Sequence, residues 1–407
     1  MDLNFQSQQF INKSAQVLTC IFIFSVFLLP PLPIVPSLPK IQVAEIMLPF
    51  ICLLLLLKFP QAAFKKISTY VLFWGLLLGV MFLSIAVNGR LGFLNDYFEV
   101  FKVFKYLIFL LFLTAYIDQI NIVFIVRLVF VLVCAFNVLH YFNWMDFNNK
   151  IMPYYCSETH IIFFGFDSEG GEATKRIVGT ASNPNNNAIL FLFFVIFFFP
   201  VKQSTITEKI FFLLAVLGLF SAQSRTALIA FVPVCLILAL NNQYQWKEYL
   251  ITFIPVLLLF FFVVKMGNTY VTVLGKGVVK TNSVKGRLAI WLYLWEMIKE
   301  KPLLGYAPSK DFFYSRKLYP ESEYVLYCWR YGFAGLLVLL SIMAYPFRVT
   351  YKYLKHKEAL NLFLYTLVFI IASITNNPFS DQNLLLIYCL MAALFFANLH
   401  KIVNSEA

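Results

Sequence analysis

Successive apolar runs of about 20 residues are the feature that most constrains this chain, because that length carries one helix across a bilayer. The predicted spans lie near residues 16–35, 42–58, 68–88, 98–117, 121–142, 184–200, 209–223, 226–240, 249–265, 324–346, 358–375 and 381–399. With 61% hydrophobic and 13% charged residues, the composition excludes an ordinary soluble protein. We therefore predict an all-α, polytopic integral membrane protein with about twelve transmembrane helices, in which residues 1–407 form a single membrane domain.

The positions of Lys and Arg predict the orientation of these spans. The basic residues of the short loops all fall on one side if both termini are cytoplasmic. This orientation places two long loops outside, at residues 143–183 and 266–322. The second carries nine basic and four acidic residues, a net charge of +5, on the face that is usually poor in Lys and Arg. An anionic ligand is the simplest explanation. Alternatively, so long a loop translocates whatever its charge and rests on lipid headgroups.

Three spans are predicted to begin at the outer face with polar clusters. The sixth starts with Asn183, a suitable N-cap, followed by Pro184 in the first turn. The eighth starts with Ser224, Arg225 and Thr226, and the tenth follows Glu321 and Glu323. Because helix N-termini expose unpaired N–H groups and a partial positive charge, these clusters favour anion binding.

Arginines on this face strengthen that hypothesis, since the guanidinium fork fits phosphate oxygens. Arg225 lies at a predicted helix start, Arg176 shortly before the sixth span, and Arg287 in an amphipathic stretch of the second long loop. The alternatives are a snorkelling helix-end residue for Arg225 and a solvated loop charge for Arg176.

Two lysines of the fourth span add to the set. Lys102 and Lys105 are three residues apart, hence on one helical face, near the outer end. Cations inside a membrane usually face a cavity or a partner. Their partner is either a nearby carboxylate, Glu99 or Asp96, or a bound pyrophosphate.

Glu323 is the candidate general base, because a carboxylate at the mouth of a helix can accept a proton from a hydroxyl nucleophile. A carboxylate that only caps the helix has the same sequence signature.

The chain has no P-loop, Gly-x-Ser-x-Gly or His-Glu-x-x-His pattern, and its four histidines are scattered. We therefore expect no metal, no cofactor and no nucleic-acid partner.

The ordered motifs "NPNNNA", "SRTALIAF", "GRLAIWLYLWEMIKEKPLLGYAPSKDF" and "ESEYVLYCWRYGFAGLL" resemble the membrane family that holds the O-antigen ligases and the Wzy-type repeat-unit polymerases. The resemblance implies a metal-independent, C-type glycosyltransferase that uses a glycan on undecaprenyl pyrophosphate at the periplasmic face of the bacterial inner membrane. Ligases of the family carry a histidine where this chain has Glu323, which favours a polymerase.

The polymerase hypothesis assigns catalytic roles to Glu323, Arg287 and Arg225. The predicted pyrophosphate- and glycan-binding residues are Arg176, Lys102, Lys105, Asn183, Asn185, Glu321 and Tyr324. The expected partners are a lipid-linked oligosaccharide, membrane lipid and a chain-length regulator protein. An O-antigen ligase and a lipid-linked oligosaccharide flippase or other transporter are the alternatives, although a transporter should carry polar residues at mid-depth rather than at one face.

Overall fold

The computed structural model describes residues 2–32, 40–156, 176–200, 204–240, 282–316 and 319–406. Within these ranges the chain is helical, and its long helices are α1 (Asp2–Leu28), α4 (Gln61–Val87), α5 (Leu94–Tyr116), α6 (Ile122–Phe142), α10 (Pro184–Phe197), α11 (Ile206–Ser221), α12 (Arg225–Leu240), α15 (Asn282–Glu300), α17 (Glu323–Thr350), α18 (Lys357–Ala372) and α19 (Gln382–Glu406). The shorter helices include α2 (Val43–Ile46), α3 (Leu48–Leu57), α7 (Phe147–Lys150), α8 (Met152–Tyr155) and α16 (Lys310–Arg316). The all-helical prediction is confirmed for the described residues.

The expected twelve spans are not confirmed. Six helices in the described ranges are long and apolar enough to cross a membrane, namely Gln8–Leu28, Gln61–Val87, Leu94–Gln119, Ile122–Phe142, Glu323–Tyr353 and Gln382–Ser405. The helices at residues 48–57, 184–197 and 225–238 are apolar but shorter, about 15 to 21 Å at 1.5 Å per residue. The span predicted at 249–265 lies outside the described residues, as do residues 157–175 and 266–281 of the two expected long loops.

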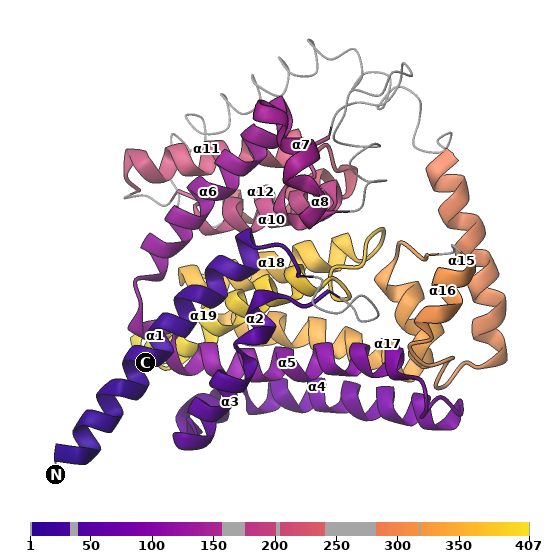
Figure 1. Ribbon diagram of the computed structural model, residues 1–407, viewed down its shortest axis with the longest axis horizontal. Coiled ribbons are helices and arrows are strands. Elements are labelled where there is room, and N and C mark those ends of the chain that lie inside the picture. Colours follow the sequence, from indigo (N-terminus) through magenta and orange to yellow (C-terminus); the bar gives the residue numbers. More distant parts are fainter. Residues whose placement is uncertain are drawn as a thin grey trace.

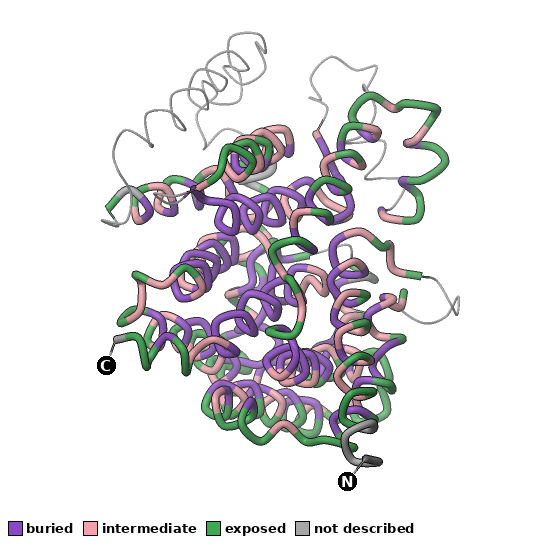
Figure 2. The backbone as a smooth tube through the Cα atoms, turned by 90° about the vertical axis from the view of Figure 1, so that its left-hand side faces the viewer, coloured by how far each residue is buried: buried purple, intermediate pink, exposed green. Residues whose placement is uncertain are grey.

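The helices are arranged in stacked layers (Figure 1). α4 and α5 form the lowest layer of that view, α17, α18 and α19 lie above them, and α6, α10, α11 and α12 lie above those. Contacts join α5 to α19, α4 to α17, and α18 to α12. The layers therefore share one hydrophobic core, which Figure 2 shows as a buried centre beneath exposed outer turns.

α10 is the most enclosed of the apolar helices. Residues 187–197 are all buried, including Phe191, Phe193 and Phe194. A helix that is apolar on every face is buried among other parts of the protein or in lipid. Because the three phenylalanines fill the core, the polar first turn of α10 is held at one end of the bundle.

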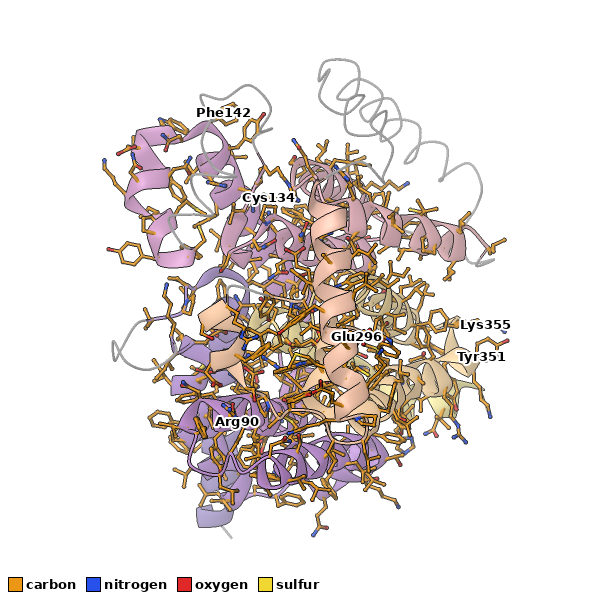
Figure 3. The ribbon with its side chains drawn as sticks, turned by 90° about the vertical axis from the view of Figure 1, so that its right-hand side faces the viewer. Arg90, Cys134, Phe142, Glu296, Tyr351 and Lys355 are labelled. Atoms are coloured by element: carbon orange, nitrogen blue, oxygen red, sulfur yellow. The ribbon has the colours of Figure 1, made fainter. Side chains whose placement is uncertain are left out.

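α15 lies across the ends of the other helices. It stands upright beside the ends of α4, α5 and α17 in Figure 1, and it crosses the front of the molecule when that side faces the viewer in Figure 3. α16 lies beside it. The starts of α5 and α17 and the end of α4 are at this side, whereas the start of α1 and the end of α19 are at the opposite side of the view.

Candidate anion-binding site

A cavity of about 210 Å³ lies where α5, α16 and α17 meet. At roughly 30 Å³ per liquid water, it has room for about seven waters, which suits a small anion and not a glycan chain. Its lining consists of Glu99, Lys102, Lys310, Phe313, Tyr319, Arg330 and Ser380. Three cations and one carboxylate give these lining residues a formal charge of +2.

A break in α17 places Arg330 in the cavity wall. Gly332 has φ +64° and ψ −166°, a conformation essentially restricted to glycine. At the break, backbone groups of α17 form hydrogen bonds with residues 302–306 instead of within the helix. Phe333 N–H donates to the Pro302 carbonyl at 2.7 Å, and Tyr306 N–H donates to the Trp329 carbonyl at 3.0 Å.

The approach is so close that two glycines are needed. A Cβ on Gly332 would lie 2.3 Å from the Leu303 backbone, and one on Gly305 would lie 2.4 Å from the Trp329 carbonyl oxygen. The "LLGYAPS" and "RYGF" stretches are therefore two halves of one backbone contact. Arg330 beside it is 3% exposed, and its Nε has no hydrogen-bond partner.

Glu99 is the common partner of the three cations. Its carboxylate lies 2.5 Å from Lys310 Nζ, 2.9 Å from Lys102 Nζ and 3.3 Å from Arg330 NH1. One carboxylate cannot neutralise three cations, and a buried excess of charge is costly unless it is paired. The arrangement is therefore suited to an anionic ligand that supplies the missing negative charge.

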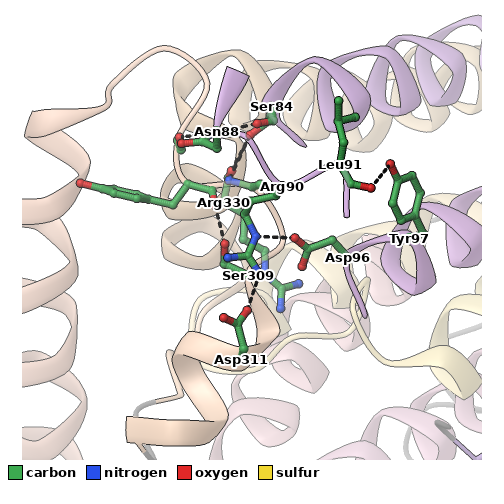
Figure 4. A network of polar contacts seen from close by, with 12 residues as sticks. Ser84, Asn88, Arg90, Leu91, Asp96, Tyr97, Ser309, Asp311 and Arg330 are labelled. Carbon is green, nitrogen blue, oxygen red and sulfur yellow. Dashed lines mark hydrogen bonds and ion pairs between the residues drawn. The ribbon is translucent and has the colours of Figure 1, made fainter. Parts of the chain in front are cut away.

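A second ion-pair network fixes α16 against α5 (Figure 4). Arg90, in the turn between α4 and α5, donates from Nε to Asp96 at 2.5 Å and from NH2 to Asp311 at 2.5 Å. Asp96 is fully buried on α5, whereas Asp311 follows Lys310 on α16. Because Arg90 bridges the two helices, it holds Lys310 over Glu99.

Burial affects the protonation of two lining residues outside the candidate spans. Desolvation lowers the pKa of Lys310 below its ordinary value, against the opposing attraction of Glu99. Desolvation likewise raises the pKa of the Tyr319 phenol, despite the nearby Arg330 and Lys102. Lys310 is thus a cation that is held at some cost, as expected for a site that binds an anion.

The two lysines of α5 have different partners. Lys102 lines the cavity, where it is paired with Glu99 and donates to the Ser380 carbonyl at 3.2 Å. Lys105 is buried and pairs with Glu45 of α2, and it does not line the cavity. Of the two carboxylates proposed as their partners, Glu99 pairs with Lys102, whereas Asp96 pairs with Arg90.

Glu323 is enclosed instead of lying at an open helix mouth. It is 0% exposed and is absent from the cavity lining. Its Oε2 accepts from Phe379 N–H at 2.9 Å and Ser380 N–H at 3.2 Å, and its Oε1 accepts from Ser380 Oγ at 2.5 Å. Glu323 is the first residue of α17, as predicted, and its carboxylate holds the chain just before α19.

The segment 373–381, between α18 and α19, contacts the N-terminal turns of α10, α12 and α17. Its Asp381 accepts from Asn186 of α10 at 2.8 Å, and Thr375 contacts Thr226 of α12. The Ser373 carbonyl accepts from Glu323 N–H at 2.9 Å. The prediction that the sixth, eighth and tenth spans begin at one end of the protein is thus supported by direct contacts.

The residues predicted around the sixth and eighth spans lie at this end. The Asn183 side chain accepts from Asn185 N–H at 2.8 Å, which confirms the predicted N-cap. Arg176 donates to Asn185 Oδ1 at 3.0 Å and to the Ala222 carbonyl at 3.2 Å. Arg225 begins α12 as predicted, and its side chain is exposed.

The remaining predicted residues flank the start of α17. Arg287 of α15 forms an ion pair with Glu321, and Tyr324 donates to the Ile370 carbonyl at 2.9 Å. Only Lys102, among all the sequence-predicted site residues, belongs to the cavity lining. The other predicted residues surround the same end of the helices without entering that lining.

The sequence profile of the O-antigen ligase family matches residues 210–340. The chain contains a domain of the O-antigen ligase family. The comparison with curated proteins finds no match. The resemblance drawn from the ordered motifs is thereby confirmed.

The O-antigen ligase domain supplies part of the cavity. Lys310, Phe313, Tyr319 and Arg330 lie inside the matched range. Glu99 and Lys102 of α5 precede that range, and Ser380, in the segment before α19, follows it. Sequence reasoning missed Arg330, although an arginine inside the apolar run "YVLYCWRYGFAGLL" is a functional signal in its own right. The sequence indicates Lys310 only as a loop charge, because nothing local indicates that α16 folds back onto α5.

Proposed function

We propose that this protein polymerises lipid-linked oligosaccharide repeat units, by transferring the growing glycan from undecaprenyl pyrophosphate to the next lipid-linked unit. The observation that carries the proposal is the cationic cavity formed between the O-antigen ligase domain and α5. Three cations around one carboxylate suit the pyrophosphate group that every such donor carries.

In the proposed reaction, an acceptor sugar hydroxyl attacks the anomeric carbon of the donor glycan. The new glycosidic C–O bond forms while the bond between the anomeric carbon and the pyrophosphate oxygen breaks, and the hydroxyl proton passes to the departing pyrophosphate. Negative charge develops on the leaving pyrophosphate, and preorganised cations stabilise it without any rearrangement of the protein. Lys102, Lys310 and Arg330 would carry out this role, with no metal ion required.

The sequence-predicted arginines fit around this centre. Arg287 and Glu321 lie beside the start of α17, and Arg176 and Arg225 lie at the starts of α10 and α12. We propose that they guide the charged headgroups and the polar glycans toward the cavity. Asn183, Asn185 and Tyr324 would contribute to the same polar surface, and Lys105 would support α5 through Glu45.

We place the cavity at the periplasmic face of the bacterial inner membrane. α19 begins beside Ser380 at the cavity and ends at the opposite side of the bundle. A periplasmic cavity therefore puts the end of α19 on the cytoplasmic side, in agreement with the distribution of Lys and Arg. A chain-length regulator protein would be a partner of such a polymerase.

An O-antigen ligase that transfers the glycan to lipid A core is the second candidate, because the matching profile describes that activity. Glu323, in the place where ligases of the family carry histidine, favours the polymerase. Deleting the gene separates the two candidates. A polymerase mutant retains single repeat units on the core and loses the longer ladder, whereas a ligase mutant loses all glycan from the core and accumulates lipid-linked polymer.

The cavity itself is tested by complementing the deletion strain with Lys310→Met. We expect loss of the long ladder with normal amounts of protein in the membrane. Lys299→Met is the matched control, since Lys299 is exposed on α15 and away from the cavity lining. Normal polymer with Lys310→Met would contradict the role assigned to the cavity.

A further inference from the structure

The contacts of Glu323 point to a role that differs from proton transfer. We infer that Glu323 is a positioning residue, which acts through Ser380 to hold the ammonium group of Lys102 in the cavity. This inference rests on the proposed function, because it assigns Lys102 to the binding of the donor pyrophosphate.

The first step of the argument is the burial of Glu323. Its exposed fraction is 0%, and it does not line the cavity, whereas its hydrogen-bond partner Ser380 does. A general base must come within hydrogen-bond reach of the proton that it removes, directly or through one water. Glu323 instead accepts three hydrogen bonds from Phe379 and Ser380.

The second step is the geometry of Ser380. Glu323 accepts from both its backbone N–H and its hydroxyl, so the residue is fixed at two points. The carbonyl of Ser380 then accepts from Lys102 Nζ at 3.2 Å, while Glu99 lies 2.9 Å from the same ammonium group. With two acceptors in fixed positions, Lys102 is directed into the cavity.

The third step is the anchoring of Glu323 itself. Its backbone N–H donates to the carbonyls of Ser373 at 2.9 Å and Asn376 at 3.2 Å. Asn377 donates to the Pro320 carbonyl at 2.9 Å, one residue after the cavity residue Tyr319. The start of α17 and the segment before α19 therefore form one rigid support, and Glu323 is its central charged group.

Glu323→Gln separates positioning from base catalysis. The amide oxygen of Gln accepts from the two backbone N–H groups, and its NH2 donates to Ser380 Oγ, so all three contacts are retained without a proton acceptor. In an assay of chain extension by the purified protein with isolated lipid-linked repeat units, we expect kcat/KM within tenfold of wild type. A loss of more than tenfold would overturn the inference, because general bases contribute about 10² to 10⁴ in rate.

A double-mutant cycle tests the connection to Lys102. We expect Glu323→Ala to lower kcat/KM for the lipid-linked donor at least tenfold, and to have no such effect in a Lys102→Met background. Equal effects in both backgrounds would overturn the connection.

If Glu323→Ala fails to fold, Ser380→Pro takes its place in the cycle, because this substitution removes both the N–H and the hydroxyl of Ser380. An inactive wild-type protein would instead contradict the proposed function, so the two failures are distinguishable.

Discussion

The ammonium group of Lys310 on α16 lies 2.5 Å from the carboxylate of Glu99 on α5. This contact joins the O-antigen ligase domain to a helix outside it. Glu99 also pairs with Lys102 and Arg330, so one buried carboxylate organises three cations from three different helices. The arrangement leaves an excess of positive charge among the residues that line the cavity.

Glu99→Gln should make the protein depend on an anion for stability. Without the carboxylate, three mostly buried cations lose their counterion, and we expect the free energy of unfolding to fall by about 3 kcal/mol. Pyrophosphate bound in the cavity would replace the lost charge and stabilise the folded state by mass action. Thermal unfolding in detergent should therefore show a larger pyrophosphate-induced shift for Glu99→Gln than for wild type. Equal shifts would indicate that pyrophosphate binds elsewhere.

Pyrophosphate binding should weaken on the alkaline side through Lys310. Burial lowers its pKa below the ordinary 10.5, so in the empty site it loses its proton as the pH rises through that lowered value. Lys310→Arg, whose guanidinium stays protonated, should maintain binding to higher pH in a calorimetric titration. An unchanged alkaline limb in Lys310→Arg would contradict the assignment.

The lowered pKa of Lys310 also changes the free energy of unfolding with pH, in a direction that follows from the protons bound by each state. Between the lowered folded-state pKa and 10.5, the unfolded chain binds more protons at Lys310 than the folded chain does. The contribution of Lys310 to the free energy of unfolding therefore rises with pH in that window.

Gly332→Ala should destabilise the cavity wall. A side chain at φ +64° and ψ −166° is strained, and its Cβ would lie 2.3 Å from the Leu303 backbone. We expect a loss of about 3 kcal/mol in the free energy of unfolding, or failure to accumulate in the membrane. Gly79→Ala in α4 is the matched control, because an added Cβ there meets nothing within 4 Å. Equal melting temperatures for the two variants would show that the break in α17 is unimportant.

The apolar runs predicted an all-helical chain, because each helix is encoded by its own residues, but they did not predict how many of the described helices are long enough to cross a membrane. Helix starts at Arg225 and Glu323 and the N-cap at Asn183 were correct for the same local reason. The cavity was not predictable in this way. It depends on the return of residues 302–310 to α17 and α5, which two glycines and the Arg90 bridge make possible.

The enclosed state of Glu323 was equally hidden from sequence reasoning. Its partners, Phe379 and Ser380, are far along the chain, and nothing in "ESEY" distinguishes a carboxylate that faces substrate from one that binds a loop. Lys102 was found because an intramembrane cation is unusual wherever it occurs. Arg330 satisfied the same criterion and would have been found by applying it to every span.

Arg90→Met should release α16 from α5. The substitution leaves the fully buried Asp96 without a cation, and we expect a loss of about 3 kcal/mol in the free energy of unfolding. Arg90→Met with Asp96→Asn should recover much of that loss, since a neutral amide needs no counterion. Thermal unfolding of the single and double variants measures both effects. A double variant no more stable than Arg90→Met would contradict this explanation of the network.

Arg225→Ala and Arg287→Ala test the arginines that sequence reasoning selected. We expect each to abolish chain extension while the protein still inserts in the membrane, because each removes a permanent cation at the end of the bundle that holds the cavity. The glycan ladder of complemented deletion strains gives the result, with protein level in the membrane as its control. Lys401→Met, an exposed substitution near the opposite end of α19, should leave the ladder unchanged. Long polymer in either arginine variant would restrict the functional centre to Lys102, Lys310 and Arg330, since charge outside the cavity lining would then be unnecessary for the reaction.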